Sequence, residues 1–178
     1  MYLALDSDDN FFKNIKEPTD RGQNRVFVDA QPVSIVPRET WGAAPARVET
    51  PLPGGVVKHV LYVYASHTRC CYSLDECSAQ LRNLQQRCFD KDKDDIFYNF
   101  MIGGDGQVYE GRGWHLAPDK YLRLGDHMDP ATIYVAYIGD FADINPNIKQ
   151  WHAGWKLLEH GFRNKIISER DFFMYYCS

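Results

Sequence analysis

The spacing of hydrophobic residues predicts alternating strands and helices along most of the chain. Val56–Ser66 and Ile133–Ile138 are apolar and rich in β-branched residues, which is typical of buried strands. In residues 96–102, large apolar side chains fall on both faces of another buried strand. Gly103–Gly106 then supplies the positive φ angles of a tight turn, which predicts a hairpin with a returning strand.

Two further segments have the period of an amphipathic helix. In the first, apolar residues recur every three or four positions: Leu74, Cys77, Leu81, Leu84 and Cys88. Ser73 and Glu76 have the spacing of a capping box at its start. The second has the apolar positions Ile148, Trp151, Trp155, Leu158 and Phe162, after the start signal Asn145–Asn147. The order strand, helix, hairpin, strand, helix, strand predicts an α/β fold, a central mixed β-sheet flanked by helices.

Length and composition predict one globular domain behind a polar segment. The chain has 178 residues, 44% of them hydrophobic, which suits a single core. Residues 1–32 are polar and charged and lack the layout of a signal peptide, so we expect a lead-in followed by a domain at residues 33–178. No run of about 18 apolar residues occurs, so we expect membrane contact only through segments absent from this chain. The net charge of -4 gives no general attraction to nucleic acid.

One motif carries a family resemblance. Asp95–Trp114 reads DIFYNFMIGGDGQVYEGRGW, which resembles the central motif D-I-G-Y-N-F-L-I-G-x-D-G-x-V-Y-E-G-R-G-W of the peptidoglycan recognition protein family. Val33–Ala43 reads VSIVPRETWGA and resembles the family's opening strand followed by R-x-x-W-G-A. The resemblance covers roughly residues 33–178. It implies the amidase-like fold, with the central motif under a groove for cell-wall fragments.

The cysteines are interpreted through the same resemblance. The five cysteines are an odd number, which leaves at least one unpaired or paired with another chain. Cys71 and Cys77 match a C-x5-C spacing that forms a small disulfide loop in the family. A metal clip is the competing interpretation, but the paired C-x-x-C units of zinc ribbons are missing. The resemblance assigns no partner to Cys70 or Cys88.

Amidase members of the family bind zinc through two histidines and a cysteine, beside a tyrosine. The resemblance places the first histidine at His67, the tyrosine at Tyr98 and the cysteine at Cys177, but Glu169 stands at the second histidine position. A glutamate could still bind zinc, yet it adds a negative charge beside the thiolate and makes the metal a poorer Lewis acid. We therefore expect no catalytic residues, no metal and no cofactor. If they bind no metal, His67 is a hydrogen-bonded histidine at the end of a strand, and Cys177 is a buried thiol or a disulfide partner.

The positions that bind peptidoglycan in the family also differ. Members that bind diaminopimelate-type stems carry Gly-Trp before the central motif and an arginine before a later strand, where the guanidinium can bind a carboxylate at two points. Here residues 91–95 read KDKDD and residues 129–132 read DPAT. Two family glycines are replaced by Phe97 and Tyr134. These side chains fill the groove if they face it, and the alternative is that they face the core.

The segment Trp114–Pro130 differs most from the family. Its aromatic residues and arginine have the composition of protein contacts, so Trp114, Tyr121 and Arg123, together with His67, are predicted to contact a ligand or partner. A solvated loop is equally consistent. A preserved scaffold with altered site residues is most similar to the ligand-silent, non-catalytic insect receptor ectodomains of the LC type.

The resemblance therefore implies an extracellular receptor or co-receptor domain, an ectodomain at the cell surface. Its partner would be another domain of the same family that carries a muropeptide, with weak or no direct binding of peptidoglycan by this chain. Two alternatives remain open: a domain that binds peptidoglycan directly and a zinc N-acetylmuramoyl-L-alanine amidase.

Overall fold

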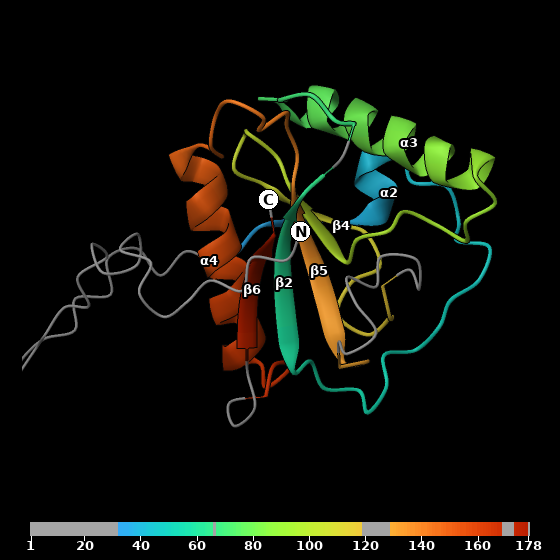
Figure 1. The fold of residues 1–178 in the computed structure, drawn as a ribbon, viewed down its shortest axis with the longest axis vertical. Coiled ribbons are helices and arrows are strands. Elements are labelled where there is room, and N and C mark those ends of the chain that lie inside the picture. Colours follow the sequence, from blue (N-terminus) through green and yellow to red (C-terminus); the bar gives the residue numbers. More distant parts are fainter. Residues whose placement is uncertain (1–31, 66, 119–128, 169–172, 178) are drawn as a thin grey trace, which may run out of the picture. The chain divides into compact units, whose positions relative to one another are not determined.

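The computed structural model describes residues 32–65, 67–118 and 129–168, and the backbone of 173–177 (Figure 1). The elements in chain order are β1 (Ile35–Val36), α2 (Arg38–Trp41), β2 (His59–Tyr64), α3 (Leu74–Asp90), β3 (Phe100–Ile102), β4 (Val108–Glu110), β5 (Thr132–Tyr137), α4 (Ile148–Arg163) and β6 (Phe173–Cys177). The predicted order of elements is confirmed. The boundary between a polar segment at 1–32 and a domain at 33–178 stays a prediction.

The strands form one mixed sheet with the order β1-β4-β3-β5-β2-β6. β3, β5, β2 and β6 run parallel to one another, whereas β4 is antiparallel to β3 and parallel to β1. The hairpin predicted at Gly103–Gly106 joins β3 to β4. This is the α/β architecture that the sequence predicts.

Each face of the sheet is covered by a helix, with two core clusters between the layers (Figure 1). Side chains of a strand alternate between faces, so Leu61 and Val63 of β2 pack with α3 while Val60 and Tyr62 pack with α4. The clusters are named here the α3-side core and the α4-side core.

The strand predicted from residue 96 begins only at Phe100, so this boundary was wrong. Ile96, Tyr98 and Asn99 are buried, but their carbonyls bind the segment after β4 instead of a neighbouring strand. Arg112 donates from Nε to Ile96 O (2.8 Å) and from its backbone N to Tyr98 O (3.0 Å). A Cβ at Gly111 would collide with Tyr98 O, so only glycine permits this approach.

Asn99 joins three parts of this layer. Its side-chain Nδ2 donates to Gly113 O and Leu116 O, both at 2.8 Å, and its Oδ1 accepts from Tyr134 N at 2.9 Å. The side chain is fully buried, so each of these backbone groups would lose its partner if the amide were removed.

α4 is confirmed, and its buried face is partly the predicted one, because Leu158 is buried and Trp151 and Phe162 pack against the α4-side core. Ile148 and Trp155 are 67% and 66% exposed. The buried residues are Gln150, Ala153, Gly154, Leu157, Leu158 and Gly161. Small residues form the contact because the helix lies close to the sheet: Tyr62 Oη donates to Gly154 O at 2.9 Å. A pattern of large apolar residues does not detect such a face.

α3 begins where the sequence predicts, with one difference in its cap. Ser73 Oγ accepts a hydrogen bond from Glu76 N at 3.3 Å, but the Glu76 carboxylate accepts from Tyr72 N (2.7 Å), one residue earlier than a capping box requires. The disulfide between Cys71 and Cys77 is confirmed, with a Cα–Cα distance of 5.1 Å. This bond links the segment before α3 to the first turn of the helix.

Replacing Cys71 and Cys77 together by alanine is expected to lower the free energy of unfolding by about 2 kcal/mol, because the short loop no longer restricts the unfolded chain. Urea denaturation of the variant and the oxidised wild-type chain measures this difference. Free thiols at both positions in unreduced wild-type protein, detected by mass spectrometry, would contradict the pairing.

Candidate functional site

The carboxyl ends of the parallel strands lie at one edge of the sheet. In open α/β sheets, ligands bind outside this edge. The segments that follow β2, β3 and β5 meet there: residues 67–73, 103–107 and 138–147, which we name the carboxyl edge. Asn147 Nδ2 donates to Gly104 O at 2.9 Å and joins two of the three segments.

The segment 67–73 runs back along α3 and is attached to it at three points. The Cys71–Cys77 disulfide is the first attachment. Gln80 Oε1 accepts from Arg69 N at 3.3 Å, and Arg87 Nη1 donates to His67 O at 2.9 Å. Residues closer to β2 are therefore attached further along the helix.

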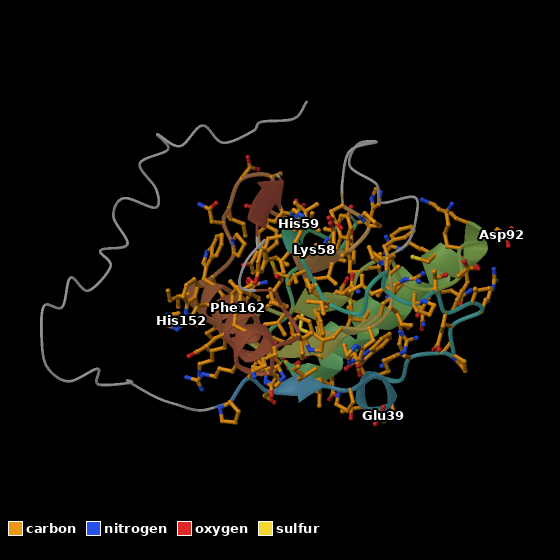
Figure 2. The ribbon with its side chains drawn as sticks, turned by 90° about the horizontal axis from the view of Figure 1, so that it is seen from below. Glu39, Lys58, His59, Asp92, His152 and Phe162 are labelled. Carbon is orange, nitrogen blue, oxygen red and sulfur yellow. A yellow bond between two sulfur atoms is a disulfide. The ribbon has the colours of Figure 1, made fainter. Side chains whose placement is uncertain are left out.

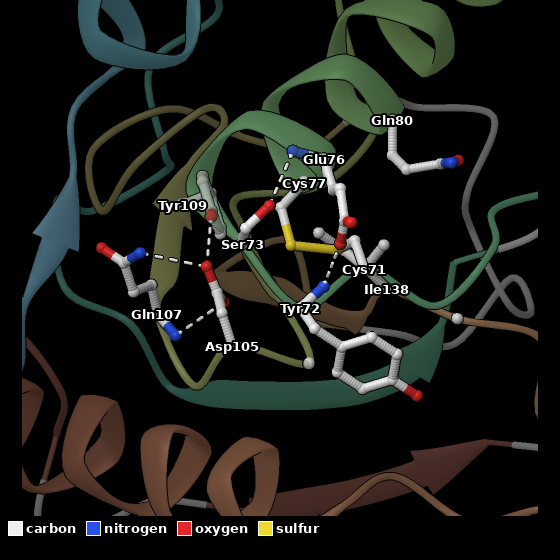
Figure 3. The surroundings of a disulfide bond; sticks show 12 residues. Cys71, Tyr72, Ser73, Glu76, Cys77, Gln80, Asp105, Gln107, Tyr109 and Ile138 are labelled. Carbon is white, nitrogen blue, oxygen red and sulfur yellow. Dashed lines mark hydrogen bonds between the residues drawn. A yellow bond between two sulfur atoms is a disulfide. The ribbon is translucent and has the colours of Figure 1, made fainter.

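The disulfide also packs against the hairpin turn between β3 and β4 (Figure 3). A Cβ at Gly103 would lie 2.7 Å from Cys77 Sγ, so no larger residue fits there without a shift. Asp105 in the turn accepts hydrogen bonds from Gln107 N (3.0 Å) and Tyr109 Oη (2.7 Å). Burial and this bond to Asp105 raise the pKa of Tyr109 far above 10. The turn is thus held by its packing against the disulfide and by the hydrogen bonds that Asp105 accepts.

His67 is exposed at the carboxyl edge and has an unusual backbone conformation. Its φ angle is 61°, in the left-handed region that non-glycine residues rarely occupy. The next residue, Thr68, is buried: its Oγ1 donates to Ala65 O (2.8 Å) and accepts from Gly139 N (2.9 Å). Thr68 and Arg87 therefore hold the backbone around His67 in this conformation. Backbone strain that is maintained by surrounding contacts is typical of functional positions.

The remaining positions of the family's zinc site are described only in part. Tyr98 is buried in the α3-side core, and Phe97 packs edge-on against its ring at 6.2 Å. Cys177 pairs in backbone register with Val63, next to the end of β2, and its side chain is outside the described part. Glu169 also lies outside the described residues. The assignment of Glu169 to the second histidine position stays a prediction.

Phe97 and Tyr134 lie on the same face of the sheet as α3. Tyr134 is only 3% exposed and belongs to the α3-side core, and Phe97 is half-buried against that core. Tyr134 therefore faces the core, which is the alternative that the sequence left open, and Phe97 packs against the same core. Their predicted role in excluding a ligand stays a prediction.

The structure describes two of the four predicted contact residues, and these two lie in different parts of the fold. Trp114 is half-buried in the α4-side core, with its ring 4.6 Å from that of Phe100. Tyr121 and Arg123 lie outside the described residues. His67 is the predicted contact residue that the structure places on the carboxyl edge. Trp114 as a contact residue stays a prediction.

Sequence patterns did not reveal Thr68, Gln80 or Arg87 as residues that position His67. The hydrogen bond from Arg87 to His67 joins residues 20 positions apart. It requires the segment 67–73 to turn back along α3, and the amphipathic period of α3 contains no sign of this.

Comparisons with known proteins agree with this architecture. A family model described as N-acetylmuramoyl-L-alanine amidase matches residues 54–174. Peptidoglycan-recognition protein 2 of Holotrichia diomphalia is 40% identical over 133 residues, which are 71% of this chain and 65% of the relative. This chain therefore spans less than two thirds of that relative's length.

Two solved structures are similar to this chain over much of its length. The ectodomain of the Drosophila transmembrane receptor PGRP-LCa has a TM-score of 0.71 at 31% identity, over 79% of this chain and 83% of the other. The ectodomain complex of PGRP-LCa and PGRP-LCx with tracheal cytotoxin gives 0.71 at 29% identity, over 81% and 84%. The fold is thus that of amidase-like domains.

The chain belongs to the peptidoglycan recognition protein family, within that amidase-like class. Its similarity extends to receptor ectodomains of the LC type.

The strain at His67 can be measured. His67→Gly is expected to be more stable to unfolding than His67→Ala by about 1 kcal/mol, because glycine has no Cβ that could clash in the left-handed conformation. Urea denaturation of the two variants gives the difference. Equal stability, or a more stable alanine variant, would mean that His67 is not held in this conformation in solution.

Proposed function

We propose that this chain is a non-catalytic receptor or co-receptor domain of innate immunity, which senses bacterial peptidoglycan by binding a partner domain of the same family that carries a muropeptide. The observation that carries the proposal is the position of Tyr134. The scaffold of a recognition protein is kept, yet an aromatic ring is buried where the family has glycine, on the face of the sheet that bears α3. Phe97 adds a second ring there.

The site chemistry supports the absence of catalysis. The family's amidase members hold zinc with two imidazoles and a thiolate, and the resemblance places Glu169 at one of the imidazole positions in this sequence. A second anionic ligand beside the thiolate lowers the charge of the centre, and a bound water would then ionise less readily. No step of hydrolysis is assigned to His67 or Tyr98.

Similarity to a two-domain assembly supports the choice of partner. PGRP-LCa, to which this chain is similar, is found in an ectodomain complex with PGRP-LCx and tracheal cytotoxin. We place the contact at His67 on the carboxyl edge and at the segment 114–130, with Trp114, Tyr121 and Arg123 as contact residues. The chain would act outside the cell, as the ectodomain of a surface receptor. None of the helices in the described residues has the length and apolar character that crossing a bilayer demands.

The purified chain is expected to contain no stoichiometric zinc and to release no stem peptide from peptidoglycan at neutral pH. Elemental analysis and an amidase assay with added zinc check this expectation. One tightly held zinc per chain, together with release of stem peptide, would favour the zinc amidase instead.

The isolated chain is also expected to show no measurable affinity for a diaminopimelate muropeptide. The reason is that the acidic group of the muropeptide would find neither space in the groove nor the arginine that binds it in other family members. Binding should appear when a muropeptide-loaded family partner is added, and Arg123→Glu should weaken that complex without unfolding the domain. Isothermal titration of the chain with muropeptide, partner or both provides the comparison.

Two outcomes contradict the proposal. Micromolar binding of muropeptide by the isolated chain would identify a direct peptidoglycan-binding domain. Equal binding of the partner with and without muropeptide would show that the ligand takes no part in the interaction.

A further inference from the structure

The outer face of α4 carries an apolar stripe. Its residues follow one another at intervals of three, four and seven positions, which places them on one side of the helix: Ile148, Trp151, Trp155 and Phe162. Trp151 and Phe162 pack partly against the α4-side core, whereas Ile148 and Trp155 are exposed. Ile144, just before the helix, is exposed as well. Among the described residues, exposed large hydrophobic side chains thus gather at this helix, and such a patch indicates an interaction surface.

A basic stripe lies beside the apolar one. It repeats the same spacing one residue later, so it is rotated by about 100° around the helix axis. Its members are Lys149, His152, Lys156 and Arg163. Figure 2 shows His152 on the outer side of the helix, where Lys149 and Arg163 are also exposed. The outer face of α4 therefore has an apolar half and a cationic half along its whole length.

This face is positively charged although the chain as a whole is not. Residues 148–165 contain four permanently positive side chains and a single carboxylate, that of Glu159, whereas the net charge of the chain is -4. Glu159 lies 2.6 Å from Arg163 and compensates that charge. The remaining cations form no ion pair within the ranges that the structure describes: Lys149, Lys156 and Lys165.

The carboxylates in the connection before α4 do not neutralise this face. Asp140 accepts a hydrogen bond from Ala142 N at 3.3 Å, and Asp143 is exposed. Neither of them forms an ion pair with a cation of α4 in the described part of the chain. Both precede the first turn of the helix, so the lysine in its middle, Lys156, has only Glu159 as an acidic neighbour on its own element.

We propose that the outer face of α4 binds the surface of a phospholipid bilayer that contains anionic lipids. An apolar stripe beside a cationic one is the pattern of helices that lie in the interface of a membrane. Tryptophan suits the level of the headgroups because its ring is apolar and its N–H is polar. Lysine can extend its ammonium group to lipid phosphates while its methylene groups stay on the apolar side.

The composition of the face favours lipid over a protein partner. Interfaces between proteins are depleted in lysine relative to the rest of the surface. Lysine nevertheless supplies three of the four permanent positive charges here. An acidic protein is therefore the alternative that the experiment has to separate from a bilayer.

A contact of this kind adds to the sequence-based expectation that the chain reaches a membrane only through segments absent from it. It needs no spanning helix, because α4 would lie on the surface of the bilayer. α3 and α4 cover opposite faces of the sheet, so a bilayer at α4 leaves the segment 67–73 beside α3 accessible. The inference does not depend on recognition of a muropeptide.

Co-sedimentation of the purified chain with lipid vesicles tests the contact. The vesicles consist of phosphatidylcholine alone or of phosphatidylcholine mixed with phosphatidylglycerol. A double variant, Lys149→Gln with Lys156→Gln, removes two cations, and Trp155→Ala removes the exposed ring. The matched control, Lys91→Gln with Lys93→Gln, also removes two cations, but these residues follow α3 on the other side of the sheet. Circular dichroism checks that each variant is folded.

Wild-type chain is expected to bind the vesicles that contain phosphatidylglycerol and not those of phosphatidylcholine alone. The variant at 149 and 156 should bind about 10-fold more weakly or worse, because each basic residue near an anionic surface contributes about a factor of five. Trp155→Ala should bind at least about 3-fold more weakly and lose most of the blue shift of tryptophan emission that vesicles cause. The control should differ from wild type by less than about 2-fold, because salt screens distant charges.

Three outcomes would overturn the bilayer contact. The first is no binding of wild-type chain to the anionic vesicles, or an equal loss in the control variant. The second is wild-type binding by Trp155→Ala, which would mean adsorption by charge alone. The third is binding of soluble polyglutamate as tight as that of the anionic vesicles, which would identify an acidic macromolecule as the partner.

Discussion

The attachment of residues 67–73 to α3 is the constraint on which the carboxyl edge depends. A connection from β2 to α3 could take many paths over the surface. Here the disulfide between Cys71 and Cys77, with hydrogen bonds from Gln80 and Arg87, leaves a single path along the helix. The path places His67 at the end of β2 and presses the disulfide against the hairpin turn of β3 and β4. One covalent bond therefore orders two of the three segments of this edge.

The third segment is held by polar contacts from α4. Gln150 Nε2 donates to Ile102 O at 3.0 Å and to Ile138 O at 3.1 Å, which joins the ends of β3 and β5 beneath the edge. Buried amides that satisfy backbone carbonyls in this way add specificity, because a shifted strand would leave those groups without partners. Together with the hydrogen bonds of Asn99, these contacts fix the strands and connecting segments that carry the exposed residues of the carboxyl edge.

Local patterns predicted the elements better than their contacts. The period of α3, the glycine-rich turn at 103–106 and the apolar run at 133–138 are local signals, and each was confirmed. The start of β3 was wrong because Arg112 and Gly111 take the carbonyls of the preceding residues, a contact across the chain.

The candidate site shows the same division. Family resemblance predicted the disulfide, which was confirmed, because its spacing is a short motif. The roles that the resemblance implies for His67 and Tyr98 stay predictions. Part of the buried face of α4 was missed because small residues such as Gly154 create it. Arg87 was missed because its contact with His67 requires the whole path of the segment 67–73. Contacts between distant segments follow from packing, which a single sequence specifies only through the completed fold.

The most direct test of the account is hydrogen–deuterium exchange of this chain in four states: alone, with muropeptide, with empty partner, and with muropeptide-loaded partner. The account predicts new protection of residues 67–73 at the carboxyl edge only with the loaded partner, while the amides of α4 exchange as in the free chain. Protection of residues 67–73 by muropeptide alone would contradict it, as would protection by loaded partner that is confined to α4.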